Sequence, residues 1–488
     1  MYKILLHGIT NKYDLQELIK VFLSPDAFVS YTDAEAEAAA DLEVKYGNGN
    51  LAAGGTQPAE IAAPAAQPIL LEINQALSAD KNEIKREIYR KLAAVTGYEP
   101  EWGILTGVRP VKLAGELLDR LQDMEAVRRT LREDYLLAES KIDLLTDTLA
   151  YQREVCGKAA PDSVGVYIGI PFCPTRCLYC SFTSNQVPDA EIARYLEALK
   201  QEIAYVGRRM RQTGLWAESI YIGGGTPTTL TAEQLDALLG TVEAAIDLSK
   251  LKEFTVEAGR PETITYEKLE VLKRHRVVRI SINPQSMHEK TLRLIGRVHQ
   301  PEDIVKAFQR ADWVGIPIVN ADVITGLPEE SPADFAETME ALLALDPENI
   351  TVHTLAVKRA SRLVEVDKDF HYKQGETVKE MLAVAQQKLK AAGFRPYYLY
   401  RQKHMAGAFE NTGYCKGDTP CIYNIRIMEE KQTILALGAG GISKIYYPDE
   451  NRLERVPNVS NYEIYISRLE EMLDRKEQNI FKEVEKRC

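Results

Sequence analysis

The sequence predicts an α/β fold in which six parallel strands form a core, between an N-terminal α+β region and a C-terminal mixed region. Three observations indicate this fold. The 488 residues suffice for about three domains. Short β-branched runs alternate with helical stretches over 163–355. A tight group of cysteines directly follows the first of those runs. Strands that are joined by helical crossovers pair in parallel.

The composition is that of a soluble globular protein, with 45% hydrophobic and 27% charged residues. The formal net charge of −11 argues against binding to duplex nucleic acid, which favours a basic surface. No run of about 18 apolar residues is present, so no membrane span is expected. The start, MYKILLHGIT, has no cleavage site of small residues and does not resemble a signal peptide. We therefore expect a cytoplasmic protein.

The first region is predicted to cover residues 1–150. It should begin with a strand at 3–6 and a helix that ends near Leu23. Residues 34–68 are rich in Ala, Gly and Pro, which predicts a loop or linker.

Another helix of this region should begin after Asp80, a good N-cap, and end at Gly97. Its predicted apolar face consists of Ile84, Ile88, Leu92 and Val95. Helical patterns continue over 111–149.

The second region, 160–356, should hold the six parallel strands. They are expected at 164–170, 219–222, 253–257, 277–282, 319–325 and 349–355. Ligands of parallel sheets bind at the C-terminal ends of the strands, so the functional site is expected there. The third region, 357–488, should contain helices at 376–392 and 462–483 around a loop-rich middle at 397–445.

The cysteine group has the spacing C-x3-C-x2-C, formed by Cys173, Cys177 and Cys180 in PFCPTRCLYCSF. Three thiolates can bind three irons of a cubane cluster and leave the fourth iron open to a small molecule. Structural zinc is the alternative, but it needs a fourth Cys or His, and none occurs in the next 90 residues. Cys156 precedes the strand and is a possible outlying ligand. Ordinary buried thiols are a third interpretation.

With Tyr179 inside it, this cysteine motif resembles that of the radical S-adenosylmethionine (SAM) enzymes, whose fold is a partial (β/α)6 barrel. The segments YIGIPFCPTRCLYC, GGGTPTTL and ADVITGLP resemble the oxygen-independent coproporphyrinogen III oxidase group. The segments LTGVRPVKLAGELL and CIYNIRIMEEKQTILALGAGGISK resemble the HemZ branch of that group. The resemblance implies two cofactors, a [4Fe–4S] cluster on the three cysteines and SAM.

The same resemblance implies a set of SAM contacts. Tyr167 and Tyr179 would pack against SAM, and the glycine run after the second strand would bind its methionine end. The polar contacts would come from the ends of later strands. The full implied set is Tyr167, Tyr179, Gly224, Gly225, Thr226, Glu257, Gln285, Arg297 and Asp322. The alternatives are strand packing for the tyrosines, a tight turn for the glycines, and capping or salt bridges for the others.

Two features depart from the group's pattern. Phe182 stands where well-studied decarboxylases have a further cysteine, which is not a cluster ligand. The histidines of some relatives have no clear counterpart; His353 is the nearest candidate, although a single His on a strand is more often structural. Cys415 and Cys421 are either a second metal site or incidental, since CKGDTPC is not a tight knuckle.

The resemblance implies oxidative decarboxylation of two propionates of coproporphyrinogen III to vinyl groups, giving protoporphyrinogen IX. The partners would be this tetrapyrrole and an electron donor such as flavodoxin or ferredoxin. Two alternatives are a haem chaperone of the same group and a radical SAM methyltransferase with another substrate. Propionates need cations, and the candidates after the sixth strand are Lys358, Arg359, Arg362, Arg401 and Lys403.

Overall fold

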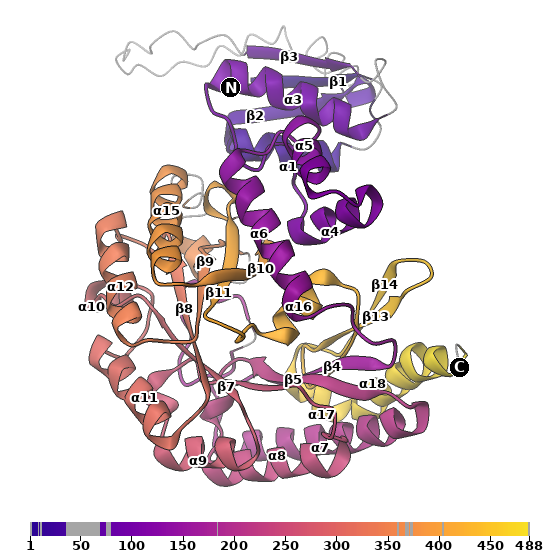
Figure 1. The fold of residues 1–488 in the computed structure, drawn as a ribbon, viewed down its shortest axis with the longest axis vertical. Coiled ribbons are helices and arrows are strands. Elements are labelled where there is room, and N and C mark those ends of the chain that lie inside the picture. The colour runs from indigo at the N-terminus through magenta and orange to yellow at the C-terminus, as the bar shows by residue number, and fades with distance from the viewer. Residues whose placement is uncertain are drawn as a thin grey trace, which may run out of the picture. The chain divides into compact units, whose positions relative to one another are not determined.

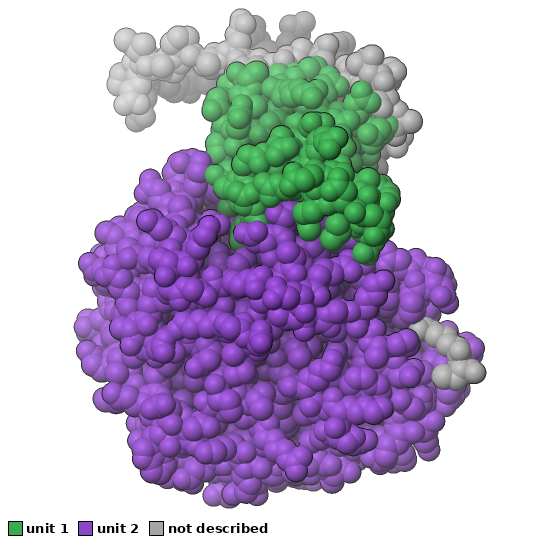
Figure 2. Space-filling model, in the orientation of Figure 1, with its two compact units in different colours: residues 1–107, 117–144 green, residues 108–116, 145–488 purple. Residues whose placement is uncertain are grey.

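The structure is a computed structural model. It describes residues 2–7, 9, 12–35, 69–74, 80–182, 184–358, 361–366, 370, 374–402 and 405–486. The predicted linker lies mostly outside these residues. The chain forms two compact units, residues 1–107 with 117–144 and residues 108–116 with 145–488, which Figure 2 shows in green and purple.

The first unit contains a three-stranded parallel sheet in the order β2-β1-β3. Its elements are β1 (Tyr2–His7), α1 (Tyr13–Phe22), β2 (Phe28–Thr32), β3 (Ile69–Asn74), α3 (Lys81–Thr96) and α5 (Met124–Glu133). The predicted caps of α3 are confirmed: Asp80 accepts a hydrogen bond from the Asn82 amide, and Gly97 ends the helix with a φ of 69°. Three residues of the predicted apolar face are buried, but Val95 is 40% exposed because it lies in the last turn.

Two helices belong partly to each unit: α4 (Pro110–Leu121) and α6 (Glu139–Val155). Both overlap the predicted helical stretch of 111–149, and α6 extends six residues beyond its end.

Six parallel strands form the centre of the second unit, in the order of the sequence, and confirm the predicted α/β core. They are β4 (Ser163–Ile170), β5 (Trp216–Gly224), β6 (Glu253–Glu257), β7 (Arg279–Gln285), β8 (Ile318–Thr325) and β9 (Asn349–Thr354). The strand predicted at 277–282 starts two residues later, because the Val277 amide still bonds the Leu272 carbonyl and ends the preceding helix.

Helices follow these strands and lie along their outer side in Figure 1. They are α7 (Asp189–Thr213), α8 (Ala232–Ala245), α9 (Tyr266–Arg274), α10 (Glu289–Leu294), α11 (Pro301–Val314), α12 (Pro332–Ala344) and α15 (Gly375–Ala391). Capping boxes begin α8 and α12, with Thr231 and Gln234 in the first and Ser331 and Asp334 in the second.

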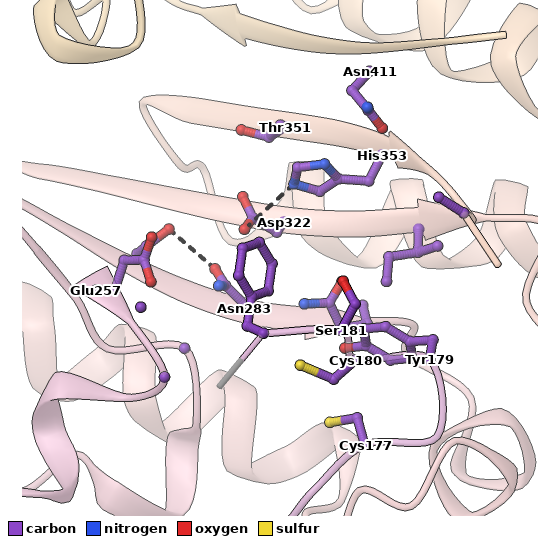
Figure 3. Close-up of a pocket in the computed structure, with 18 of the residues that line it drawn as sticks. Cys177, Tyr179, Cys180, Ser181, Glu257, Asn283, Asp322, Thr351, His353 and Asn411 are labelled. Atoms are coloured by element: carbon purple, nitrogen blue, oxygen red, sulfur yellow. Dashed lines mark hydrogen bonds and ion pairs between the residues drawn. The ribbon is translucent and has the colours of Figure 1, made fainter. Parts of the chain in front are cut away.

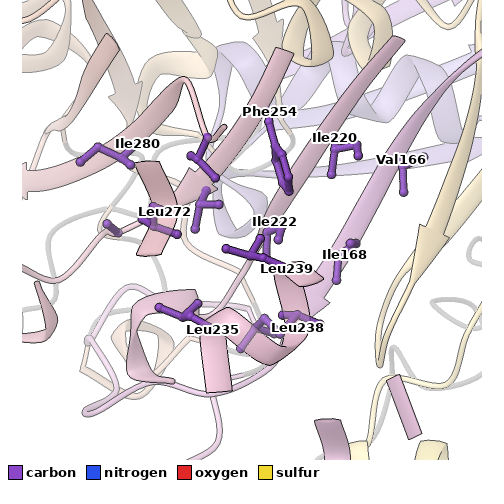
Figure 4. Packing of buried hydrophobic residues seen from close by; sticks show 14 of the residues in the cluster. Val166, Ile168, Ile220, Ile222, Leu235, Leu238, Leu239, Phe254, Leu272 and Ile280 are labelled. Carbon is purple, nitrogen blue, oxygen red and sulfur yellow. The ribbon is translucent and has the colours of Figure 1, made fainter. Parts of the chain in front are cut away.

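Alternate residues of each strand face these helices and form one hydrophobic core. Figure 4 shows Val166, Ile168, Ile220, Ile222 and Phe254 of the strands packed against leucines of α8 and α9. Because side chains alternate along a strand, the residues between them point to the inner side of the curved sheet. There the sequence places Tyr167, Tyr221 and Glu257 instead of aliphatic residues.

The prediction that the middle of the C-terminal region, residues 397–445, is rich in loops is wrong. It contains β10 (Arg395–Arg401), β11 (Glu410–Cys415), α16 (Ile422–Glu429), β12 (Thr433–Leu437) and β13 (Ile442–Tyr447), and β14 (Arg452–Pro457) follows. These strands extend the core sheet on both sides to eleven strands, in the order β10-β11-β9-β8-β7-β6-β5-β4-β12-β13-β14.

The predicted final helix is divided into α17 (Tyr462–Ser467), α18 (Leu469–Lys476), a π-helical segment (Glu477–Phe481) and α19 (Lys482–Glu485). No helix in the described part of the chain is both long and apolar enough to cross a membrane.

Candidate active site

A cavity of about 340 Å³ opens at the C-terminal ends of the parallel strands, where the site was expected. Its size falls at the lower end of the range for small-molecule pockets. The three cysteines of the motif line it, together with polar residues of β5 to β9 and of β10, β11 and α16. Figure 3 shows Cys177 and Cys180 on one side, with Asp322 and His353 on strands across from them.

The cysteine loop is fixed at both ends by backbone hydrogen bonds. The Cys173 amide donates to the Asn185 carbonyl at 3.1 Å, and the Asn185 amide donates to the Pro171 carbonyl at 2.9 Å. In the middle, the Leu178 amide donates to the Ile295 carbonyl at 2.9 Å. The loop therefore presents its thiols to the cavity on a defined backbone.

Burial raises the pKa of Cys173 to about 11 and also raises the pKa of Cys180. These thiols are protonated at neutral pH unless a cation binds, and thiol ligands lose their protons when a metal binds. No three Cys, His, Asp or Glu side chains among the described residues are close enough to hold one metal ion. A cubane cluster requires more widely spaced thiolates, since each binds a different iron.

Arg260 is a residue that sequence reasoning missed. Its Nη1 donates to the Cys177 sulfur at 3.4 Å, and its Nη2 donates to the Thr175 carbonyl at 3.1 Å. The buried guanidinium therefore lies against one of the three predicted cluster ligands. Arg260 follows Glu257 by three residues in TVEAGRP, so its position after a strand was a signal that it faces the site.

The glycine run packs against the start of the cysteine loop. The Gly225 amide donates to the Ile170 carbonyl, and the Thr226 amide donates to the Phe172 carbonyl, both at 2.7 Å. A Cβ at position 225 would lie 2.4 Å from the Phe172 oxygen. Gly224 has a φ of 111°, which excludes most other residues. Gly224, Gly225 and Thr226 all line the cavity, and the glycines also permit this backbone contact.

Glu257 and Asp322 form the acidic part of the cavity wall. The Tyr221 hydroxyl donates to Glu257 at 2.7 Å. Burial raises the pKa of Glu257 to about 7, and the negative charge of Asp322 contributes to the rise. Burial alone would raise the pKa of Asp322, but the hydrogen bond and charge of His353 hold it below its usual value. The His353 Nε2 lies 3.5 Å from an Asp322 oxygen.

Arg297 connects three parts of the site. One guanidinium nitrogen donates to the carbonyls of Gly259 and Asn283, at 3.0 and 2.6 Å, and the other donates to the Tyr179 hydroxyl at 3.2 Å. Tyr179 and Arg297 both line the cavity, as does Gln285. The Gln285 Oε1 is buried without a hydrogen-bond partner among the described residues. It therefore suits a ligand with a hydrogen-bond donor at this position.

Tyr167 is placed differently from the other implied SAM contacts. It is not among the described residues that line the cavity. Its ring stacks on those of Tyr221 and Tyr423, with centroids 6.4 and 6.2 Å apart. A Cβ at position 224 would lie 3.2 Å from the Tyr167 hydroxyl, so this hydroxyl is close to Gly224. A direct contact between Tyr167 and SAM stays a prediction.

Of the five cations predicted to bind the substrate, Lys358 lines the cavity, with its ammonium 5.8 Å from the Phe182 ring. Arg362 is exposed. Arg401 is buried outside the cavity and donates to the Ala408 carbonyl, so its predicted role is wrong. Arg359 and Lys403 lie outside the described residues.

Cys415 and Cys421 are both buried but have different partners. The Cys415 thiol donates to the Tyr151 hydroxyl at 3.3 Å, and the Cys421 thiol donates to Glu253 at 3.1 Å. Of the two interpretations that the sequence left open, incidental thiols agree better with these contacts than a second metal site does.

Comparison with known proteins identifies the family. The Radical SAM superfamily model matches residues 167–342. The oxygen-independent coproporphyrinogen-III oxidase-like protein HemZ of Bacillus subtilis is 38% identical over 401 residues, which cover 81% of this chain and 80% of HemZ. This chain belongs to the HemZ family of radical SAM proteins. The superfamily uses a [4Fe–4S] cluster and SAM, and the thiol loop and the polar cavity beside it fit both.

Two other proteins match smaller parts of this HemZ family protein. The heme chaperone HemW of B. subtilis is 33% identical over 234 residues, covering 47% of this chain and 61% of HemW. The solved structure of coproporphyrinogen III oxidase (HemN) from Escherichia coli, described as a radical SAM enzyme, matches with a TM-score of 0.52. That match covers 66% of this chain and 73% of HemN at 22% identity, and it confirms the predicted fold.

Proposed function

We propose that this chain is a cytoplasmic radical SAM oxidoreductase that converts two propionates of coproporphyrinogen III to vinyl groups, giving protoporphyrinogen IX. Each conversion removes one hydrogen atom, one CO2 and one electron from a propionate; the hydrogen atom would pass to the adenosyl group of SAM, and the electron to an external acceptor. The observation that carries the proposal is the similarity to HemZ over 80% of that protein's length. When bound, the cluster and SAM supply the radical chemistry, with electrons from a donor such as flavodoxin or ferredoxin.

The chain's own residues would divide the work between the two sides of the cavity. Cys173, Cys177 and Cys180 would hold the cluster on the loop side. The strand ends would hold SAM through Glu257 and Asp322, whose carboxylates suit its ammonium and ribose hydroxyls.

Lys358 would bind a substrate carboxylate. It is partly buried in the cavity wall, and burial lowers the pKa of its ammonium. A partly desolvated cation attracts a carboxylate more strongly than an exposed one does. The same cavity is also lined by neutral hydrogen-bonding groups, among them Ser281, Asn283 and Thr351.

Anaerobic reconstitution followed by product analysis with coproporphyrinogen III tests this proposal. Vinyl products should form, and Lys358→Met should lower turnover much more than it lowers SAM cleavage without substrate. Lys388→Met is the matched control, because Lys388 lies on α15 and pairs with Glu340. SAM cleavage without any vinyl product would contradict the proposed reaction.

A second candidate is a haem chaperone, which the similarity to HemW favours. A chaperone would bind haem stably and form no vinyl product. Stable haem binding by protein that cleaves SAM, with no decarboxylation, would support this alternative.

A further inference from the structure

Four cations gather around a single carboxylate on the second unit, away from the cavity. Arg109 directly precedes α4 and Lys112 lies in its first turn, Lys444 belongs to β13 and Arg455 to β14. All four lie within 4 Å of Glu430: the distances are 3.0, 3.4, 3.6 and 3.4 Å, in the order Arg109, Lys112, Lys444 and Arg455. We call these four cations and Glu430 the basic cluster.

The basic cluster is not electrically balanced. Four positive groups and one carboxylate give it a net charge of +3. The chain as a whole has a net charge of −11, so this concentration of cations runs against the overall composition. Uncompensated like charges at this density repel one another and attract anions.

The positions of these cations are electrostatically unfavourable. Lys444 and Arg455 stand directly opposite each other in the β13–β14 ladder, where like charges are unfavourable. Burial, together with the charges of Arg109 and Arg455, lowers the pKa of Lys444 to about 8. The Arg109 Nε is buried and has no hydrogen-bond partner among the described residues. An unmade hydrogen bond of a charged donor is costly, so a missing acceptor is indicated.

We propose that the basic cluster binds a compact oxyanion, a phosphate or a carboxylate group, between Arg109, Lys444 and Arg455. Such a group would offset the excess positive charge and would accept a hydrogen bond from the Arg109 Nε. Arginines bind planar and tetrahedral oxyanions through paired hydrogen bonds. The Arg455 side chain is 56% exposed, so the site is open on its side and accepts an anionic group that belongs to a larger molecule.

Inorganic phosphate is the first probe, added to the full-length protein at constant ionic strength so that screening does not change. The thermal midpoint should rise saturably with phosphate, because a ligand stabilises the folded state that binds it. Lys444→Met should raise the midpoint without phosphate, by relieving the repulsion, and should weaken phosphate binding about tenfold, as expected for one lost charged hydrogen bond.

Arg455→Gln is the second variant, because its exposed position makes misfolding no concern, and it should weaken phosphate binding to a similar extent. Lys306→Met is the control: Lys306 is 59% exposed, pairs with Asp303 on α11, and should leave the response to phosphate unchanged. No saturable effect of phosphate in the wild-type protein, or an equal effect in wild type and both cluster variants, would overturn the proposal.

Coproporphyrin III, which carries four carboxylates and fluoresces, is the second probe. If phosphate displaces a fraction of the bound porphyrin, and Arg455→Gln removes that fraction, the cluster binds tetrapyrrole carboxylates. If phosphate binds saturably and displaces no porphyrin, the cluster's ligand is a phosphate. Either result is independent of whether the cavity decarboxylates its substrate.

Discussion

The Glu257 carboxyl must be ionised to bind a cationic ligand, yet burial raises its pKa to about 7. Below pH 7 the free protein holds a proton on this group, and SAM has to displace it. We therefore expect SAM affinity to fall by up to about tenfold for each pH unit below 7, because one pKa unit corresponds to about 1.4 kcal/mol. Equilibrium binding of SAM to reconstituted protein between pH 5.5 and 8 measures this dependence.

The matched variant is Glu257→Gln, which keeps the shape of the side chain and cannot titrate. It should bind SAM more weakly at pH 8 and show a much flatter pH dependence. A wild-type affinity that does not change with pH would contradict the proposed role of Glu257 in SAM binding.

The three thiols of the cysteine loop should be individually essential for the cluster. Replacing any one of Cys173, Cys177 or Cys180 by Ala should remove most of the iron and sulfide, because two thiolates hold a cubane weakly. Iron and sulfide analysis after anaerobic reconstitution measures this. Cys156→Ala is the control and should keep about four irons per chain. Loss of the cluster in that variant alone would exclude the proposed ligand set.

At the scale of elements, backbone hydrogen bonds join the glycine run to the start of the cysteine loop. Gly225→Ala places a Cβ 2.4 Å from the Phe172 oxygen, one residue before Cys173. We expect a loss of about 1–3 kcal/mol in unfolding free energy from this overpacking, and less iron after reconstitution. This differs from a role of Gly225 in SAM binding alone, which would leave the cluster intact.

Gly240→Ala provides the matched control, since Gly240 lies within α8 and a Cβ there would meet nothing closer than 4.0 Å. That variant should be as stable as wild type or up to about 1 kcal/mol more stable. Chemical denaturation and iron analysis of both variants measure the difference. Full iron content in Gly225→Ala would show that the two segments are not coupled.

The sequence predicted β4 to β9 well because each strand has one face of β-branched residues that a helix covers. It failed for β10 to β14. Four of these strands contain tyrosine or charged residues, whereas β12 is the apolar run TILAL, and all five extend the edges of the sheet that β4 to β9 form. The site shows the same contrast. Cysteines and glycines are visible as motifs in the sequence. In contrast, Arg260 donates to the Cys177 thiol, and the Asn283 carbonyl accepts a hydrogen bond from Arg297; only the folded chain brings these groups together.

At the scale of the whole second unit, a buried ion pair attaches the C-terminal helices to the barrel. The Lys476 ammonium lies 2.7 Å from Glu202 of α7, and both side chains are fully buried. Glu202 also accepts hydrogen bonds from the Tyr465 hydroxyl and the Gly438 amide, at 2.6 and 2.7 Å. Burial alone would raise the pKa of Glu202, but Lys476 and these donors hold it below its usual value.

Removing one partner of this pair leaves the other charge buried without compensation. We expect Lys476→Met to lower the unfolding free energy by about 3–5 kcal/mol, measured by chemical denaturation.

Since the pKa of Glu202 is lowered on folding, its stabilising contribution is present above the unfolded pKa near 4.5 and lost as pH falls below it. In Lys476→Met the buried Glu202 has lost its cation and takes up a proton as the pH falls, which removes the buried charge, so the loss should be large at pH 7 and shrink toward pH 4. The double variant Glu202→Gln with Lys476→Met should recover part of the stability, because no charge is then buried. An equal loss at pH 7 and pH 4 would show that packing of the lysine stem, and not the ion pair, attaches these helices.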